Sequence, residues 1–140
     1  MKLIVLIVFL LIFSMVSGQY AIEGTWKTID DTSGKPRSID KIFEKNGKRH
    51  GRIERDLDEN ERNQLCIECK GNDYNKPIEG LEIIKNLEKD DNEYTNGTIL
   101  DPENGKVYKC KIWIDDTNPN ILNVRGYVAF FYRTQHWLRE

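Results

Sequence analysis

The hydrophobic positions of the chain form two different patterns. Residues 3–16 are almost all apolar, whereas from Ile22 onward the apolar residues come in short runs bounded by Gly, Pro, Asn and Asp. These runs are rich in Val, Ile, Tyr, Phe and Trp, which is typical of β-strands joined by turns. The sequence therefore predicts strands at 22–29, 37–45, 48–56, 96–100, 106–114, 121–130 and 133–139.

Two short segments have the composition of tight turns. Asn46-Gly47 separates two predicted strands, and both residue types tolerate the positive φ of a two-residue type I′ hairpin. Residues 101–105 combine a proline near the start with a glycine at the end, which favours a turn between two strands. Each segment therefore predicts a hairpin.

The middle of the chain is less regular. Residues 57–75 are polar, carry two cysteines and show no period, so we expect a long loop and treat it as a candidate lid. Residues 77–87 fit a helix through Leu81, Ile84 and Leu87, but they also nearly alternate as a strand does. We favour the strand.

These elements predict an all-β fold. Within 106–114, Tyr108, Cys110 and Ile112 share one face and lysines occupy the other, so Cys110 is expected to point inward. A meander of about eight strands has exposed edges unless it closes on itself. We therefore expect a small antiparallel up-and-down barrel of about eight strands, with a two-layer sandwich as the alternative.

The apolar run at the start has the layout of a secretory signal peptide. It follows Met1-Lys2, ends at the small residues Ser17-Gly18, and is shorter than the roughly 20 residues that span a bilayer. We predict that residues 1–18 are a cleaved signal peptide and that residues 19–140 are a single exported barrel domain with no integral membrane span.

Composition narrows the function classes. A chain of 140 residues with 39% hydrophobic and 31% charged positions suits one globular domain rather than two. Lys and Arg number 21 against 23 Asp and Glu, a net charge of −2. Because nucleic-acid binding rests on an excess of positive charge, we expect no nucleic-acid partner.

Three cysteines follow the predicted signal peptide. In an oxidising compartment we expect a disulfide among Cys66, Cys69 and Cys110, and the sequence leaves the three pairings open. The flanks of the Cys-x-x-Cys resemble loop rather than the strand-to-helix junction of a redox motif. No second paired motif completes a zinc site with His50 or His136. We therefore favour a structural disulfide, and expect no metal and no cofactor.

A series of short motifs runs through the chain in a fixed order: Gly24-Thr25-Trp26, Gly34-Lys35-Pro36, Asn46-Gly47-Lys48, Gly51-Arg52-Ile53, Cys66-Ile67-Glu68-Cys69, Pro77-Ile78-Glu79-Gly80-Leu81, Gly97-Thr98-Ile99-Leu100-Asp101-Pro102, Gly105-Lys106-Val107-Tyr108-Lys109-Cys110, Val124-Arg125-Gly126-Tyr127 and Thr134-Gln135-His136-Trp137-Leu138-Arg139. The series resembles an uncharacterised bacterial family, domain of unknown function 2147, over essentially all of residues 19–140. The resemblance implies a small exported bacterial protein, periplasmic or secreted, with a calycin (lipocalin-like) barrel. It implies no established activity.

The resemblance also suggests roles for single residues. In calycins the first-strand tryptophan closes the barrel base and a terminal arginine stacks across it, so Gly24, Trp26 and Arg139 are expected to stabilise the barrel. The strand phase places Arg125 toward solvent or toward a polar lumen, where a guanidinium can pair with a carboxylate. The candidate ligand-binding residues are Arg125, Tyr108 and Tyr127.

No catalytic constellation stands out. The paired acids at 30–31, 90–91 and 115–116 lie in predicted turns, and neither histidine has a serine in a nucleophile context. We therefore expect no enzyme but a barrel that binds a small hydrophobic or anionic ligand. The alternative is a packed barrel whose outer aromatic residues contact a protein partner of the envelope.

Overall fold

The computed structural model describes residues 20–140. The predicted signal peptide, residues 1–18, lies outside the described residues. Within 20–140, no helix has the length and apolar character needed to cross a membrane.

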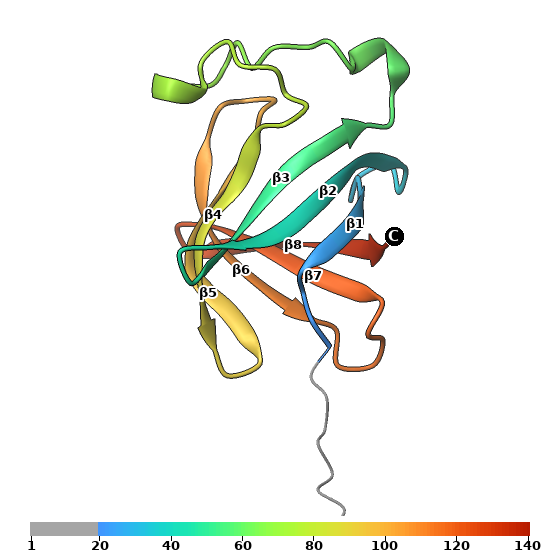
Figure 1. The fold of residues 1–140 in the computed structure, drawn as a ribbon, viewed down its shortest axis with the longest axis vertical. Coiled ribbons are helices and arrows are strands. Elements are labelled where there is room, and N and C mark those ends of the chain that lie inside the picture. The colour runs from blue at the N-terminus through green and yellow to red at the C-terminus, as the bar shows by residue number, and fades with distance from the viewer. Residues whose placement is uncertain (1–19) are drawn as a thin grey trace, which may run out of the picture.

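Eight antiparallel strands form a closed barrel in which each strand pairs with the next along the chain and β8 pairs with β1 (Figure 1). This confirms the predicted up-and-down barrel and excludes the sandwich. The strands are β1 (Gly24–Ile29), β2 (Pro36–Lys45), β3 (Lys48–Asp56), β4 (Glu82–Asp90), β5 (Glu93–Leu100), β6 (Val107–Ile114), β7 (Ile121–Val128) and β8 (Phe131–Arg139).

The predicted tight hairpin is present between β2 and β3. Asn46 and Gly47 adopt φ values of 54° and 77°, and Lys45 pairs directly with Lys48 across the turn. Two consecutive positive φ angles are the feature that makes Asn-Gly the favoured type I′ pair. The turn chemistry thus fixes the register of both strands.

The last hairpin differs from the prediction at its turn. The sequence places Phe130 in a strand and begins the final strand at Arg133, but Ala129 and Phe130 form the turn and β8 begins at Phe131. Ala129 adopts φ 51° there, which is uncommon for a residue with a Cβ. An aromatic run without Gly or Asn carries no local signal for a turn.

A long segment, residues 57–81, connects β3 to β4 and lies across one end of the barrel (Figure 1). We call it the lid. It contains two short 3₁₀ turns and one isolated bridge between Leu65 and Pro77. The predicted strand at 77–87 therefore starts late, at Glu82, because the lid still occupies residues 77–81.

Barrel closure depends on a short contact between the first and last strands. The β1–β8 register consists of Trp26 opposite Arg139 and Lys27 opposite Leu138, next to a hydrogen bond from the Glu140 N–H to the Thr25 carbonyl. These residues lie at the end of the barrel away from the lid. We call that end the base.

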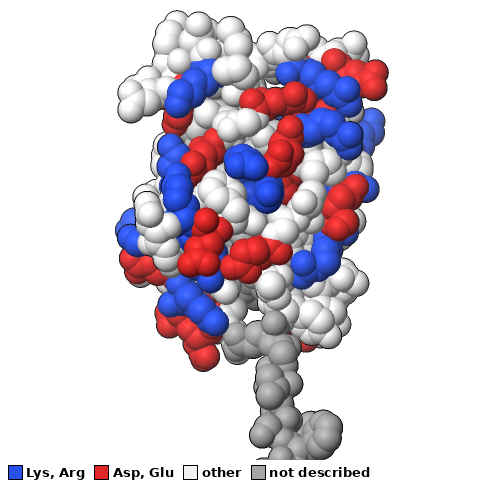
Figure 2. All heavy atoms as spheres, viewed as in Figure 1, with Lys and Arg blue, Asp and Glu red and all other residues white. Residues whose placement is uncertain are grey.

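Charged side chains of both signs are interspersed on the outer surface. Figure 2 shows basic and acidic groups alternating over the viewed face rather than forming a patch of one sign. Several of them form ion pairs, Lys45 of β2 with Glu82 of β4 and Lys48 of β3 with Glu88 of β4. The viewed face therefore presents no field of one sign that would favour a polyanion.

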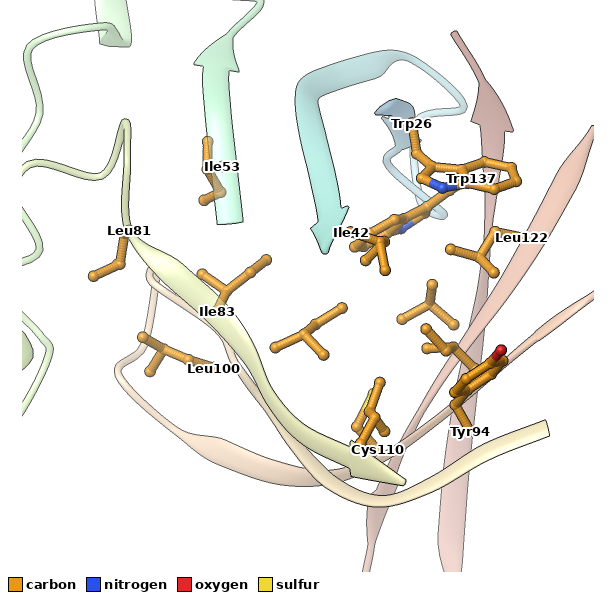
Figure 3. Packing of buried hydrophobic residues seen from close by; sticks show 14 of the residues in the cluster. Trp26, Ile42, Ile53, Leu81, Ile83, Tyr94, Leu100, Cys110, Leu122 and Trp137 are labelled. Atoms are coloured by element: carbon orange, nitrogen blue, oxygen red, sulfur yellow. The ribbon is translucent and has the colours of Figure 1, made fainter. Parts of the chain in front are cut away.

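Large apolar side chains fill the base. Trp26, Trp137, Ile42 and Leu122 gather beside one another there (Figure 3). Cys110 is also buried in the core, as the alternation in β6 predicts. Burial raises the pKa of its thiol to about 12, so the thiol stays protonated and unreactive at neutral pH.

Candidate ligand-binding site

The half of the barrel under the lid is hollow. A cavity of about 920 Å³ lies there, within the range of about 300–1,000 Å³ typical of small-molecule sites. All eight strands contribute residues to its walls, and the lid and the turn after β5 surround its mouth. The apolar part of its lining includes Ile53, Ile83, Ile99, Leu100, Val124 and Trp137.

One wall of the cavity is polar and consists of three linked side chains. The Ser38 hydroxyl donates a 2.6 Å hydrogen bond to Oδ1 of Asp40, and Ser38 Oγ lies 2.8 Å from Thr28 Oγ1. Because the single Ser38 proton points to Asp40, the Thr28 hydroxyl is the donor in the second bond. Both hydroxyl protons therefore point along the chain toward the carboxyl group.

Asp40 is the ionisable group of this wall and is almost fully buried, with an exposed fraction of 1%. Burial, opposed by the Ser38 hydrogen bond, raises the pKa of Asp40 from 3.8 to about 7. The acids Glu54 and Asp56 raise it further, and Arg37 lowers it. A carboxyl group in this setting keeps its proton to a higher pH than a free carboxyl group does, and a nearby cation favours its ionised form.

The mouth of the cavity carries more acids than bases. Six Asp and Glu residues line the cavity against two arginines. Arg37 is paired with Glu103, and Arg133 is paired with Asp31 and also donates a 3.2 Å hydrogen bond to the Thr32 hydroxyl. The two cations of the lining are thus already engaged.

A disulfide shapes the lid next to the mouth. Cys66 and Cys69 are joined, which resolves the three open pairings and leaves Cys110 as a free thiol. Sγ of Cys66 lies 3.7 Å from the Pro102 carbonyl oxygen, so the disulfide loop packs on the β5–β6 turn. Within residues 20–140, no group of three or more His, Cys, Asp or Glu side chains is placed to hold a metal ion.

Gly105 allows this close packing. It has φ 72°, and a Cβ at this position would lie 1.8 Å from the Glu68 carbonyl oxygen. We therefore expect Gly105→Ala to push the disulfide loop off the turn and to lower the free energy of unfolding by about 1–3 kcal/mol. Chemical denaturation, together with the rate of proteolytic cleavage within residues 57–81, measures both effects.

The β1–β2 turn offers a matched control. Gly34 has φ 73°, donates to the Asp30 carbonyl as Gly105 does to the Asp101 carbonyl, and has no atom within 4 Å of the position that a Cβ would occupy. Gly34→Ala therefore causes backbone strain without a clash and should leave cleavage of the lid unchanged. Equal cleavage of the lid in the two variants would contradict the packing argument.

The structure separates the three predicted ligand-binding residues. Tyr108 lines the cavity and accepts a 3.3 Å hydrogen bond from the Asn104 amide. Arg125 lies on the outer face, where its Nε donates a 2.9 Å bond to Thr134 Oγ1 and its guanidinium lies 4.0 Å from the ring centre of Tyr132. Tyr127 also packs on Tyr132. This corrects the placement of Arg125 and Tyr127 in a ligand site, because their phase along β7 turns both side chains outward.

The residues predicted to close the barrel meet at the base. The Arg139 guanidinium lies 4.3 Å from the ring centre of Trp26 and donates to the carbonyls of Ala21 and Pro119. The Trp26 indole donates a 2.8 Å bond to the Ile22 carbonyl. Gly24 pairs with Ile42 at the start of β1. None of the three lies in the lining of the cavity.

Sequence reasoning missed the polar wall. The pattern Ser38-x-Asp40-x-Ile42 places two polar residues on the same face as a buried isoleucine, and Thr28 and Trp26 occupy the facing positions of β1. That alternation is visible in the sequence. It becomes informative only once the inward face of the strand is known.

Fold and site together define a small, lidded β-barrel with an internal cavity, the architecture of lipocalin-like proteins. The family model described as "Uncharacterized protein conserved in bacteria (DUF2147)" matches residues 24–139, and the chain belongs to that family. No curated protein matches the chain.

A solved structure supports the fold. The chain is similar to protein HP1028 from the human pathogen Helicobacter pylori, a protein that belongs to the lipocalin family, with a TM-score of 0.73 and 19% sequence identity. The similarity covers 86% of this chain and 83% of that one. At this identity it shows a shared barrel and nothing about a shared ligand.

Proposed function

We propose that the protein is an exported carrier or sensor barrel that binds one small, partly apolar molecule in the cavity under its lid. The observation that carries this proposal is the cavity of about 920 Å³, which combines an apolar floor with the polar wall of Thr28, Ser38 and Asp40. An apolar pocket with a few convergent polar groups is the usual form of a small-molecule site. The proposal includes no catalytic step.

Two features support a periplasmic or secreted location. The layout of residues 1–18 is that of a signal peptide, and the Cys66–Cys69 disulfide is stable where the compartment is oxidising. We therefore include export to the bacterial envelope in the proposal.

Gly126 provides a test because it lines the cavity and has space around it. A Cβ there would meet Ile99 and Tyr108 only at 3.8 Å, ordinary contact distance. We expect Gly126→Leu to fold and to occupy part of the cavity. Native mass spectrometry of the protein isolated from its own cell envelope should show a bound mass that denaturation removes and that is at least tenfold less abundant in the variant.

The control variant is Lys109→Leu, which adds the same side chain to the exposed face of β6. It should keep the bound mass. A wild-type protein that is empty in repeated preparations, or a bound mass that Gly126→Leu leaves intact, would contradict binding in the cavity.

A second candidate function rests on a separate observation. The β7–β8 turn exposes an aromatic run, Phe130, Phe131 and Tyr132, with Phe130 98% exposed. Contiguous exposed apolar surface is typical of contact with a partner. An interaction module would be favoured over a carrier by two results together. The wild-type protein would carry no bound mass, and a protein partner that binds the wild-type protein would not bind Phe130→Ser.

A further inference from the structure

The charge of the cavity points to the charge of its ligand. Asp40 is the only fully buried acid among the described residues, and it lies on the wall of the cavity rather than in the packed base. The Ser38 hydroxyl donates to its Oδ1, and the Thr28 hydroxyl donates in turn to Ser38 Oγ. Such donors stabilise a carboxylate and contribute nothing to a carboxylate on the ligand.

No free cation of the lining lies close enough to neutralise Asp40. Arg37, on the same strand, is half exposed and held by Glu103. The other charged groups that act on Asp40 are Glu54 and Asp56 of β3, and both are acids. A ligand that brings a positive charge would therefore meet an uncompensated carboxylate in a site where opposite charges are less screened than in water.

An anionic ligand meets the opposite situation. The lining holds six acids, and both of its arginines are paired with carboxylates, Arg37 with Glu103 and Arg133 with Asp31. To bind a carboxylate or a phosphate, the site would have to break one of these pairs and accept repulsion from the remaining acids. The cavity thus disfavours the anionic ligand that the sequence led us to consider.

The apolar part of the lining indicates the chemistry of the uncharged part of the ligand. The floor near Asp40 is apolar, with Trp137, Val124 and Ile53 in the lining. These side chains suit an alkyl or aromatic body, which gains free energy by leaving water. The same molecule must therefore carry one cationic hydrogen-bond donor and an apolar part.

We propose that the cavity binds cationic amphiphiles: a protonated amine pairs with the Asp40 carboxylate and an apolar body packs on the floor. This inference rests on the proposed function, because it names the ligand class of the same cavity. It assigns Asp40 as the residue that selects for charge.

Three probes of equal length test the selection. Calorimetric titration of the isolated protein at pH 7.5 should show that decylamine binds at least tenfold more tightly than decanol, and decanol at least tenfold more tightly than decanoate. In Asp40→Asn, decylamine should lose its tenfold advantage over decanol. Asp116→Asn, the same change in the exposed β6–β7 turn, should keep the wild-type order.

A measurement on the wild-type protein covers the case in which Asp40→Asn does not fold. At pH 6, titrations in two buffers of different ionisation enthalpy should show release of about one proton per bound decylamine and none per bound decanol, because Asp40 gives up its proton to form the ion pair. Absence of proton release would overturn the pairing.

The outcomes separate the two proposals. Equal binding of all three probes, tighter binding of decanoate, or an amine preference that persists in Asp40→Asn would overturn the cationic class and leave the carrier proposal standing. If no probe binds while the cavity of the wild-type protein is empty in native mass spectrometry, both proposals fail.

Discussion

Trp26→Ala is expected to lower the free energy of unfolding by about 3–5 kcal/mol, the usual cost of removing a large aromatic side chain from a packed core. Trp26 is fully buried at the base, and its indole satisfies the Ile22 carbonyl. The substitution also removes the ring on which the Arg139 guanidinium lies. Urea unfolding followed by circular dichroism measures the change.

The matched control is Trp113→Ala on the outer face of β6. Trp113 is only partly buried and contacts Lys111 and Arg125, so its loss should have a much smaller effect. Because Trp26 does not line the cavity, ligand affinity in Trp26→Ala should stay within about twofold under conditions where the variant is folded. A large loss of affinity with unchanged stability would show that Trp26 binds rather than closes the barrel.

The stability of the wild-type protein relative to Asp40→Asn should fall as the pH rises from 4 to 8. Asp40 has its pKa raised to about 7 in the folded state, against about 3.8 in the unfolded chain, so between these values the folded state holds the extra proton. Folding then becomes less favourable with rising pH. Since one pKa unit corresponds to about 1.4 kcal/mol, the difference should reach on the order of 4 kcal/mol above pH 7.

Urea titrations of both proteins across this range give the difference directly, and the change should favour Asp40→Asn as the pH rises. Asp115 serves as a contrast, because hydrogen bonds from Asn123 and Thr117 lower its pKa to about 2. The stabilisation from Asp115 is present above pH 4 and is lost as the pH falls toward 2. A difference between wild type and Asp40→Asn that does not vary with pH would contradict the buried acid.

Local chemistry was enough to predict most of the barrel. Asn46-Gly47 set one hairpin, and the alternation around Cys110 set the inward face of β6. The prediction was wrong where no local signal exists, as at the Ala129-Phe130 turn. The predicted strand at 77–87 also begins too early, since β4 starts at Glu82. Apolar residues of the lid continue the strand pattern of β4 without belonging to that strand.

The site was harder to predict than the fold, for a physical reason. A shift of one residue in strand phase exchanges the inner and outer faces. The sequence alone therefore did not decide whether Arg125 or Asp40 points into the barrel. The structure places Arg125 against Trp113 and Tyr132 outside, and Asp40 on the cavity wall. The Gly105 contact with the lid joins segments that are distant in the sequence and has no signature in either one.

The short β1–β8 register has a mechanical consequence. Backbone hydrogen bonds complete the ring of strands at the base, around Trp26 and Arg139, but toward the lid the two strands are bridged by side chains, Arg133 reaching Asp31 and Thr32. Side-chain pairs at the surface are far weaker and more sensitive to salt than a strand ladder. The barrel is therefore rigidly closed at its base, whereas at its rim the first and last strands are not joined by backbone hydrogen bonds. The rim can widen there without breaking any backbone hydrogen bond between strands.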